Sequence, residues 1–173
     1  MFHRIGILLL FVIGISCTAK KQEDKSKVVN KTNMTSVKTY ADYTDLDDRA
    51  TKKLKDWNEY HELKEFLGEF KSVSATEALN NALELKRLTK QLKDSSDIDI
   101  MKIPAFRARI NVFENEVLRL ADMTYISAIK ANEVSAQIEK TLTLFGSVNA
   151  KLNNIYLKKQ FDAEINLDSL FKQ

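Results

Sequence analysis

Side chains that commonly carry out catalysis or bind metal ions are few in this sequence. It contains two histidines, His3 and His61, and a single cysteine, Cys17. Zinc sites, Cys–His dyads and haem attachment motifs need these residue types in larger numbers or at fixed spacings. The four glycines lie far apart, so no glycine-rich phosphate loop is present. The sequence therefore predicts no catalytic residues, no metal site and no cofactor.

His61 is the histidine with the best chance of acting as a ligand. It lies beside Glu62 and four residues after Trp57, in a segment with helical periodicity. In a helical bundle, His61 could bind a b-type haem together with Met101 or Met123, because His/Met ligation of haem iron occurs in such bundles. A histidine at the boundary of the core is the alternative, and we favour it.

Three aspartates, Asp94, Asp97 and Asp99, form an acidic group shortly before Pro104. Such a group suggests calcium binding. A calcium loop between two helices needs a glycine at its sharp turn and a bidentate glutamate at its end. This segment has neither, so we interpret the aspartates as polar loop residues.

The single cysteine follows an apolar segment at the N-terminus. Arg4 precedes residues 5–15, which carry no charge, and Ser16 and Cys17 come next. A short basic start and an apolar run of about a dozen residues are typical of a secretory signal peptide. A membrane-spanning helix would need about 20 apolar residues, and Lys20 arrives too early for that.

The segment Ile13-Gly14-Ile15-Ser16-Cys17 resembles the lipobox of bacterial lipoproteins, with a small residue directly before the cysteine. It departs from the usual pattern at Gly14, where a large aliphatic residue is commoner. The resemblance implies a signal peptide over residues 1–16, lipidation of Cys17, and a mature chain of 173 − 16 = 157 residues. Acylation would also account for an unpaired thiol in an exported chain. The alternative is an ordinary signal peptide cut after Ala19, with the cysteine discarded.

The residues after Cys17 bear on the destination of such a lipoprotein. Thr18 is not an aspartate, which is compatible with sorting to an outer membrane. The run Lys20-Lys21-Gln22-Glu23-Asp24 resembles the basic-then-acidic export tag on surface lipoproteins of Bacteroidetes-type bacteria. The resemblance therefore implies an outer membrane lipoprotein of the bacterial cell envelope, on its periplasmic or its surface face.

The composition predicts one helical domain behind a tether. Four glycines and one proline leave few helix breakers in 173 residues. Residues 17–43 are polar, rich in Lys and Thr and poor in large apolar side chains, which is typical of a flexible tether. We expect a helical domain over residues 44–164 and a frayed tail over residues 165–173. The net charge of +3 is small, so we expect no nucleic-acid partner.

Apolar residues recur at steps of three and four through the predicted domain, as in amphipathic helices. We expect the first helix to begin at Thr44 or Asp45 and to run to about Lys71. The sequence Ser74-Ala75-Thr76-Glu77 fits a capping box and should start a second helix that ends near Asp94.

Pro104 suits the first turn of a third helix, and the apolar stripe that follows it is long. Two architectures are compatible with this stripe. In an elongated antiparallel hairpin, one coiled-coil-like helix runs from Pro104 to Glu164; in an up-down four-helix bundle, that segment breaks near Asn132 or Gly146. We favour the unbroken helix, because neither break has a clear cap. Either way the fold is all-α, with three to four helices and a long C-terminal helix.

Long helices without a recognisable reactive group predict a role in binding. We expect a non-enzymatic envelope lipoprotein, held to the membrane through Cys17, whose helices bind a partner protein or self-associate. The alternative is a helical bundle that binds an apolar ligand or cofactor in the periplasm or at the cell surface. Aromatic residues such as Trp57, Phe106 and Phe145 would line its pocket.

Overall fold

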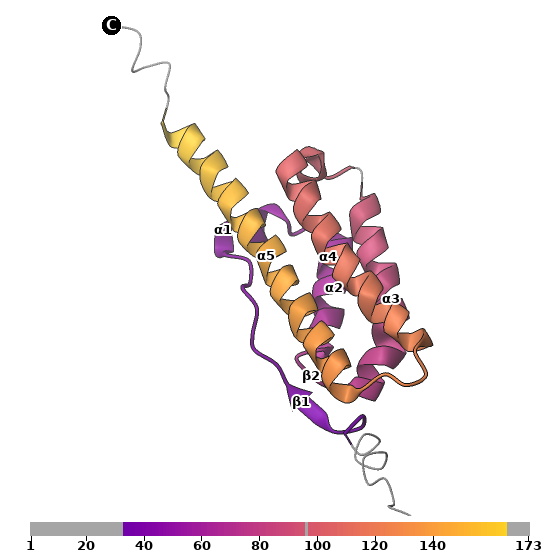
Figure 1. The fold of residues 1–173 in the computed structure, drawn as a ribbon. Helices are drawn as coiled ribbons and strands as arrows, with labels where there is room; N and C mark the ends of the chain where they lie inside the picture. The colour runs from indigo at the N-terminus through magenta and orange to yellow at the C-terminus, as the bar shows by residue number, and fades with distance from the viewer. Residues whose placement is uncertain (1–32, 96, 166–173) are drawn as a thin grey trace, which may run out of the picture.

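The computed structural model describes residues 33–95 and 97–165 (Figure 1). Its α-helices are α1 (Asp48–Lys53), α2 (Asn58–Glu69), α3 (Ala75–Asp94), α4 (Pro104–Asp122) and α5 (Ala131–Glu164). Short 3-10 helices precede and follow α4, η1 (Asp99–Lys102) and η2 (Met123–Tyr125). The strands β1 (Val37–Thr39) and β2 (Ser72–Ser74) pair antiparallel, with Val37 opposite Ser74. The predicted all-α fold class is confirmed. The predicted signal peptide and Cys17 lie outside the described residues, as do residues 166–173.

The four longer helices form an up-down bundle. Figure 1 shows α2, α3, α4 and α5 following one another with alternating direction, and α4 packs against both α3 and α5. The short strand pair lies at the end of the bundle where α2 connects to α3 (Figure 1). α5 extends past the other helices at the opposite end. The C-terminal helix is thus long, as the sequence predicts.

The predicted first helix, from Thr44 or Asp45 to Lys71, is divided in the structure. α1 begins after Asp47, whose carboxylate accepts the backbone N–H of Ala50 at 2.7 Å. Residues 54–57 form a turn, and α2 starts at Asn58. The division has a physical cause: residues 44–47 are held extended along α5, so α1 packs on α5 rather than continuing the axis of α2.

The single helix that we favoured over residues 104–164 is also wrong. α4 ends at Asp122, and α5 starts at Ala131 after η2 and a loop. The chain thus adopts the four-helix alternative, with its break near Asn132. The cap that the sequence did not reveal is Glu133, whose carboxylate accepts the Lys130 N–H at 2.9 Å and so binds a donor at the start of α5.

Residues 33–43 pack on the helical domain, although their composition predicted a tether. Tyr40 is 8% exposed, and its N–H donates to the carbonyl of Lys71 at 2.9 Å. The tether prediction is therefore wrong for residues 33–43, while residues 17–32 lie outside the described part of the chain. Composition could not show this, because backbone hydrogen bonds and two tyrosine rings, Tyr40 and Tyr43, attach the segment instead of a run of apolar side chains.

Aromatic side chains fill the centre of the bundle. The Phe145 ring lies 5.9 Å from that of Tyr60, 5.6 Å from that of Phe113 and 5.1 Å from that of Tyr43, between ring centroids. Trp57 stacks on Tyr60 at 5.6 Å. These rings join α2, α4 and α5 to the N-terminal segment, and they pack on one another.

The predicted capping box is present at the start of α3. The Ser74 hydroxyl oxygen accepts the Glu77 N–H at 3.2 Å, and the Glu77 carboxylate accepts the Ser74 N–H at 3.0 Å. The hydrogen bonds from the Ser74 N–H and hydroxyl to the Glu77 carboxylate lower the pKa of Glu77. The cap is therefore strongest when Glu77 is ionised.

Ser74→Ala should lower the free energy of unfolding by about 1 kcal/mol, because it removes the acceptor for one N–H of the first turn. Ser72→Ala is the control; Ser72 is exposed in the same strand, and its replacement should change stability by less than about 0.5 kcal/mol. Urea unfolding followed by circular dichroism measures both.

Since the folded-state pKa of Glu77 is lowered, the cost of Ser74→Ala should shrink as the pH falls through the range where glutamate protonates. Equal losses in both variants would contradict this assignment.

Candidate functional site

The structure gives His61 a partner within its own chain. One ring nitrogen, Nε2, lies 3.0 Å from the carbonyl oxygen of Leu54, in the turn between α1 and α2. Its ring also meets the edge of Tyr60. Met101 in η1 and Met123 in η2, the candidate haem ligands, lie at opposite ends of α4. The contact of His61 supports the turn that divides the predicted first helix.

The acidic loop before Pro104 forms local ion pairs. Asp94 pairs with Lys90 at 2.6 Å, and Asp99 pairs with Lys102 at 2.8 Å. In residues 33–95 and 97–165, no group of three or more His, Cys, Asp or Glu side chains is arranged to hold a metal ion. These aspartates are engaged by neighbouring lysines.

Glu116 is the one buried acidic side chain in the part of the chain that the structure describes. Burial raises the pKa of its carboxyl, but hydrogen bonds from Gln137 and Lys140 outweigh this effect and leave the pKa below its usual range. Gln137 donates to both the carbonyl and the carboxylate of Glu116, at 2.8 and 3.0 Å, and Lys140 lies 3.0 Å from the carboxylate. This cluster joins α4 to α5, and its polar atoms satisfy one another.

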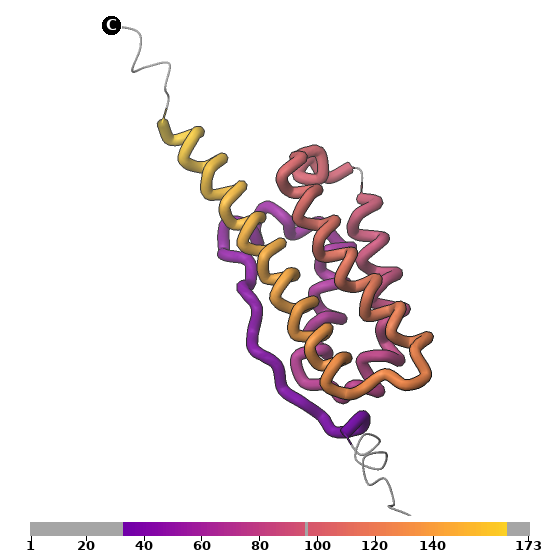
Figure 2. The backbone as a smooth tube through the Cα atoms, in the orientation of Figure 1, coloured from indigo at the N-terminus to yellow at the C-terminus, as the bar shows by residue number. Residues whose placement is uncertain are grey.

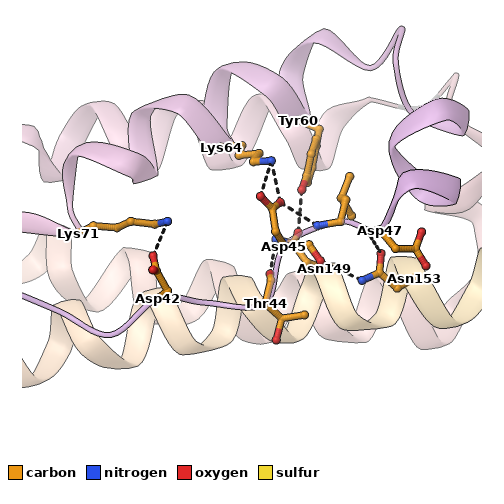
Figure 3. A network of polar contacts seen from close by, with 10 residues as sticks. Asp42, Thr44, Asp45, Asp47, Tyr60, Lys64, Lys71, Asn149 and Asn153 are labelled. Atoms are coloured by element: carbon orange, nitrogen blue, oxygen red, sulfur yellow. Dashed lines mark hydrogen bonds and ion pairs between the residues drawn. The ribbon is translucent and has the colours of Figure 1, made fainter.

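The most extensive polar network holds an extended segment, residues 40–47, which we call the N-terminal strap. Figure 3 shows the strap passing between α2 and α5. Asn149 donates to the carbonyl of Thr44 at 2.8 Å. Asn153 donates to the carbonyl of Asp45 at 2.9 Å and accepts the N–H of Asp47 at 3.0 Å. The Asn153 amide therefore bonds to the edge of the strap as a neighbouring β-strand would.

A buried tyrosine fixes the direction of the first asparagine. Tyr60 on α2 is fully buried, and its hydroxyl donates to the side-chain oxygen of Asn149 at 2.9 Å. Burial raises the pKa of Tyr60, so the hydroxyl keeps its proton and acts as the donor. The Asn149 oxygen is thereby occupied, and its NH₂ group is directed to Thr44. The strap is thus connected through α5 to α2.

Two ion pairs link the strap to α2 and to the turn that follows it. Asp45 lies 2.7 Å from Lys64, and Asp42 lies 2.7 Å from Lys71 (Figure 3). Burial raises the pKa of Asp45, but the hydrogen bond from Lys64 outweighs it and the pKa is lowered. Because all four side chains are substantially exposed, such pairs contribute little stability. They orient the strap, and the asparagines hold it.

Gly146 permits the strap to approach α5 closely. A Cβ atom at this position would lie 3.0 Å from the backbone nitrogen of Thr44 and 3.0 Å from the Cβ of Tyr43. We had considered Gly146 a candidate break in the helix, yet α5 continues through it. The sequence signal for this contact is a glycine and two asparagines, Asn149 and Asn153, along one side of an amphipathic helix.

The last turns of α5 present a different surface. Residues 156–164, which we call the free end of α5, form the last turns of this helix, whose end projects beyond the bundle (Figure 1). Leu157 and Phe161 are 51% and 58% exposed there. Tyr156 and Lys159 instead border a hollow that they share with α1. The sequence pattern alone singles out neither Leu157 nor Phe161.

In comparisons with known proteins, no family model, no curated protein and no solved structure matches this chain. Within residues 33–95 and 97–165, none of the helices combines the length and the apolar character needed to cross a membrane. Cys17, the predicted lipidation site, lies outside the described residues.

The two glycines of the described helices provide a matched test of the strap contact. Gly68→Ala should raise the free energy of unfolding by about 0.5–1 kcal/mol, because alanine is the better helix former and a Cβ at Gly68 would meet nothing within 4 Å. Gly146→Ala adds the same methyl group against the strap backbone. We expect it to lose that gain and to destabilise the domain by about 1 kcal/mol, because the strap must shift outward.

Urea unfolding of the two variants measures this difference, and hydrogen exchange locates it. In Gly146→Ala, the amide of Asp47, which Asn153 holds at 3.0 Å, should exchange faster than in the parent. Stabilisation of similar size in both variants would show that the strap does not press on α5 at this point.

Proposed function

We propose that the protein is a non-enzymatic lipoprotein of the bacterial cell envelope, tethered through Cys17, whose helical domain binds a partner protein. The free end of α5 is the observation that carries the interaction role. Its exposed Leu157 and Phe161 form an apolar surface on a helix that continues past its neighbours. The resemblance of residues 13–17 to a lipobox supports the membrane tether.

The length of α5 explains why this surface is available. With 34 residues it is about 50 Å long, whereas the 20 residues of α3 make about 30 Å. The last turns of α5 therefore extend past the bundle (Figure 1). Leu157 and Phe161 are four residues apart, which places them one turn apart on the same side of the helix.

Those two side chains suit the groove of a partner helix. About half of each is exposed, so burying both against a partner would contribute roughly 1 kcal/mol per side chain. Helices that bind in the groove of a partner protein present apolar residues three or four positions apart. A second copy of this chain could supply that groove, and the experiment below separates this case from a different partner.

Replacing Leu157 and Phe161 together by serine should abolish partner capture in a tagged pull-down from membranes solubilised in mild detergent. Leu83→Ser with Val112→Ser is the matched control, since both residues are apolar and about half exposed, on α3 and α4. Both double variants should unfold within about 0.5 kcal/mol of the parent per site. The control should retain the partner in stoichiometric amount.

Light scattering of the purified chain identifies the partner as a second copy when the parent is a dimer and the Leu157/Phe161 variant is a monomer. A monomeric parent with no co-purifying chain would contradict the proposed interaction role.

Intact mass tests the tether. The chain isolated from its own membranes should begin at Cys17 and carry a diacyl or triacyl increment, because acyl chains rather than a helix would hold it there. Cys17→Ser should leave the chain without acyl groups and remove it from the mature membrane-bound pool. A soluble chain that begins at Lys20, without acyl groups, would contradict the anchor.

A further inference from the structure

α1 and the free end of α5 border an open hollow of about 430 Å³. Its lining residues are Arg49 and Lys53 from α1, and Tyr156, Lys159, Gln160 and Ala163 from α5. Every charged side chain in this lining is basic. A neighbouring, smaller hollow shares Lys53 and Lys159, and its lining includes three acids, Asp56, Asp97 and Asp99.

Among the residues that the structure places, several other lysines near α5 and the strap form ion pairs, whereas the basic residues of the hollow do not. Lys64 and Lys71 pair with strap aspartates, and Lys158 pairs with Asp162 at 2.6 Å. Arg49, Lys53 and Lys159 form no ion pair with any residue placed by the structure. Lys159 lies over the Tyr156 ring, 5.4 Å from its centroid. Three positive charges thus line one hollow without forming an ion pair among the described residues, and the nearby Asp99 acts on Lys159 only through a longer-range charge interaction.

Arg49 adds a second, independent observation. Its Nη1 atom is buried and has no hydrogen-bond partner among the described residues, although the side chain as a whole is only partly buried and lines the hollow. A guanidinium does not lose its charge in proteins. A buried donor without an acceptor is unfavourable. An anion against the accessible part of the guanidinium would not reach Nη1, but it would neutralise the positive charge, which all three nitrogens share.

We propose that this hollow binds a phosphate group carried on a small organic molecule. Arginine and lysine together are the usual cationic partners of phosphate. The volume exceeds what an inorganic ion fills and falls in the range of small-molecule sites. The Tyr156 ring and Ala163 supply apolar contacts for the carrier of the phosphate, and Gln160 supplies a polar contact for its hydroxyl groups.

The site is separate from the apolar surface of the proposed partner interaction. Tyr156 and Gln160 face the hollow, while Leu157 and Phe161 each follow one residue later, about 100° further around the helix. Substitutions of Leu157 and Phe161 therefore leave the residues of the hollow unchanged, and substitutions in the hollow leave the apolar surface unchanged. The phosphate site does not depend on the identity of a protein partner.

Calorimetric titration of the Cys17→Ser chain with glycerol 3-phosphate at low salt tests the proposal, with glycerol and inorganic phosphate as comparison ligands. We expect glycerol 3-phosphate to bind about tenfold more tightly than inorganic phosphate, since only the former has hydroxyl groups to bond to Gln160 and a carbon chain to lie against the Tyr156 ring, and we expect no binding of glycerol. Equal affinities for glycerol 3-phosphate and inorganic phosphate would overturn the proposal.

Two adjacent lysines give a matched pair of variants. Lys53→Gln removes a residue of the lining, and Lys52→Gln removes the same charge one position earlier, outside the lining. Both lie in the last turn of α1, so their effects on the helix are alike. We expect Lys53→Gln to weaken binding by about tenfold and Lys52→Gln by less than about twofold. Equal weakening would show a diffuse attraction and no built site.

Co-sedimentation with vesicles that contain phosphatidylglycerol identifies the source of the phosphate. Binding that Lys53→Gln reduces and Lys52→Gln does not would assign the site to a lipid headgroup. Binding of glycerol 3-phosphate without vesicle binding would assign it to a soluble phosphate ester. The absence of both would overturn the proposal.

Discussion

The amide side chains of Asn149 and Asn153 hold the backbone of the N-terminal strap against α5, and much of the fold follows from this contact. Because residues 44–47 are extended there, the helix that their sequence favours cannot start until Asp48. α1 is consequently placed on α5, and the chain must turn at residues 54–57 to enter α2. The same placement brings Arg49 and Lys53 beside the free end of α5. Tyr60 connects the contact to the core by orienting Asn149.

Sequence reasoning succeeded where structure is set by near neighbours. The capping box at Ser74, the proline at the first turn of α4 and the end of α3 near Asp94 each depend on residues within one turn. It failed where contacts with a segment far away in the sequence determine the local structure. The apolar periodicity of Leu54 and Trp57 continues through a turn because both side chains still reach the core, and periodicity alone does not reveal that the axis has changed.

The candidate surfaces were harder to anticipate for a related reason. A helical pattern shows which residues share a face, but it does not show where the neighbouring helices end. The exposure of Leu157 and Phe161 results from the difference in length between α5 and its neighbours. The basic hollow joins Lys53 to Lys159, far apart in sequence, and only the path of the strap places them together. A search for catalytic residue types does not detect a site built from common lysines and an arginine.

The course of the strap also has a mechanical consequence. The described chain begins beside the N-terminal end of α5, where Asn33 and Val37 border a hollow with Ala131 and Ser135. From there the strap runs alongside α5 in the same direction (Figure 2). A pull on Asn33 directed away from that end acts along the strap, so its bonds to Lys71, Asn149 and Asn153 carry the load together in shear rather than opening one at a time. Because forced unfolding is governed by the unfolding rate, a chain of this design that is held at its N-terminal side would resist pulling more strongly than its equilibrium stability indicates.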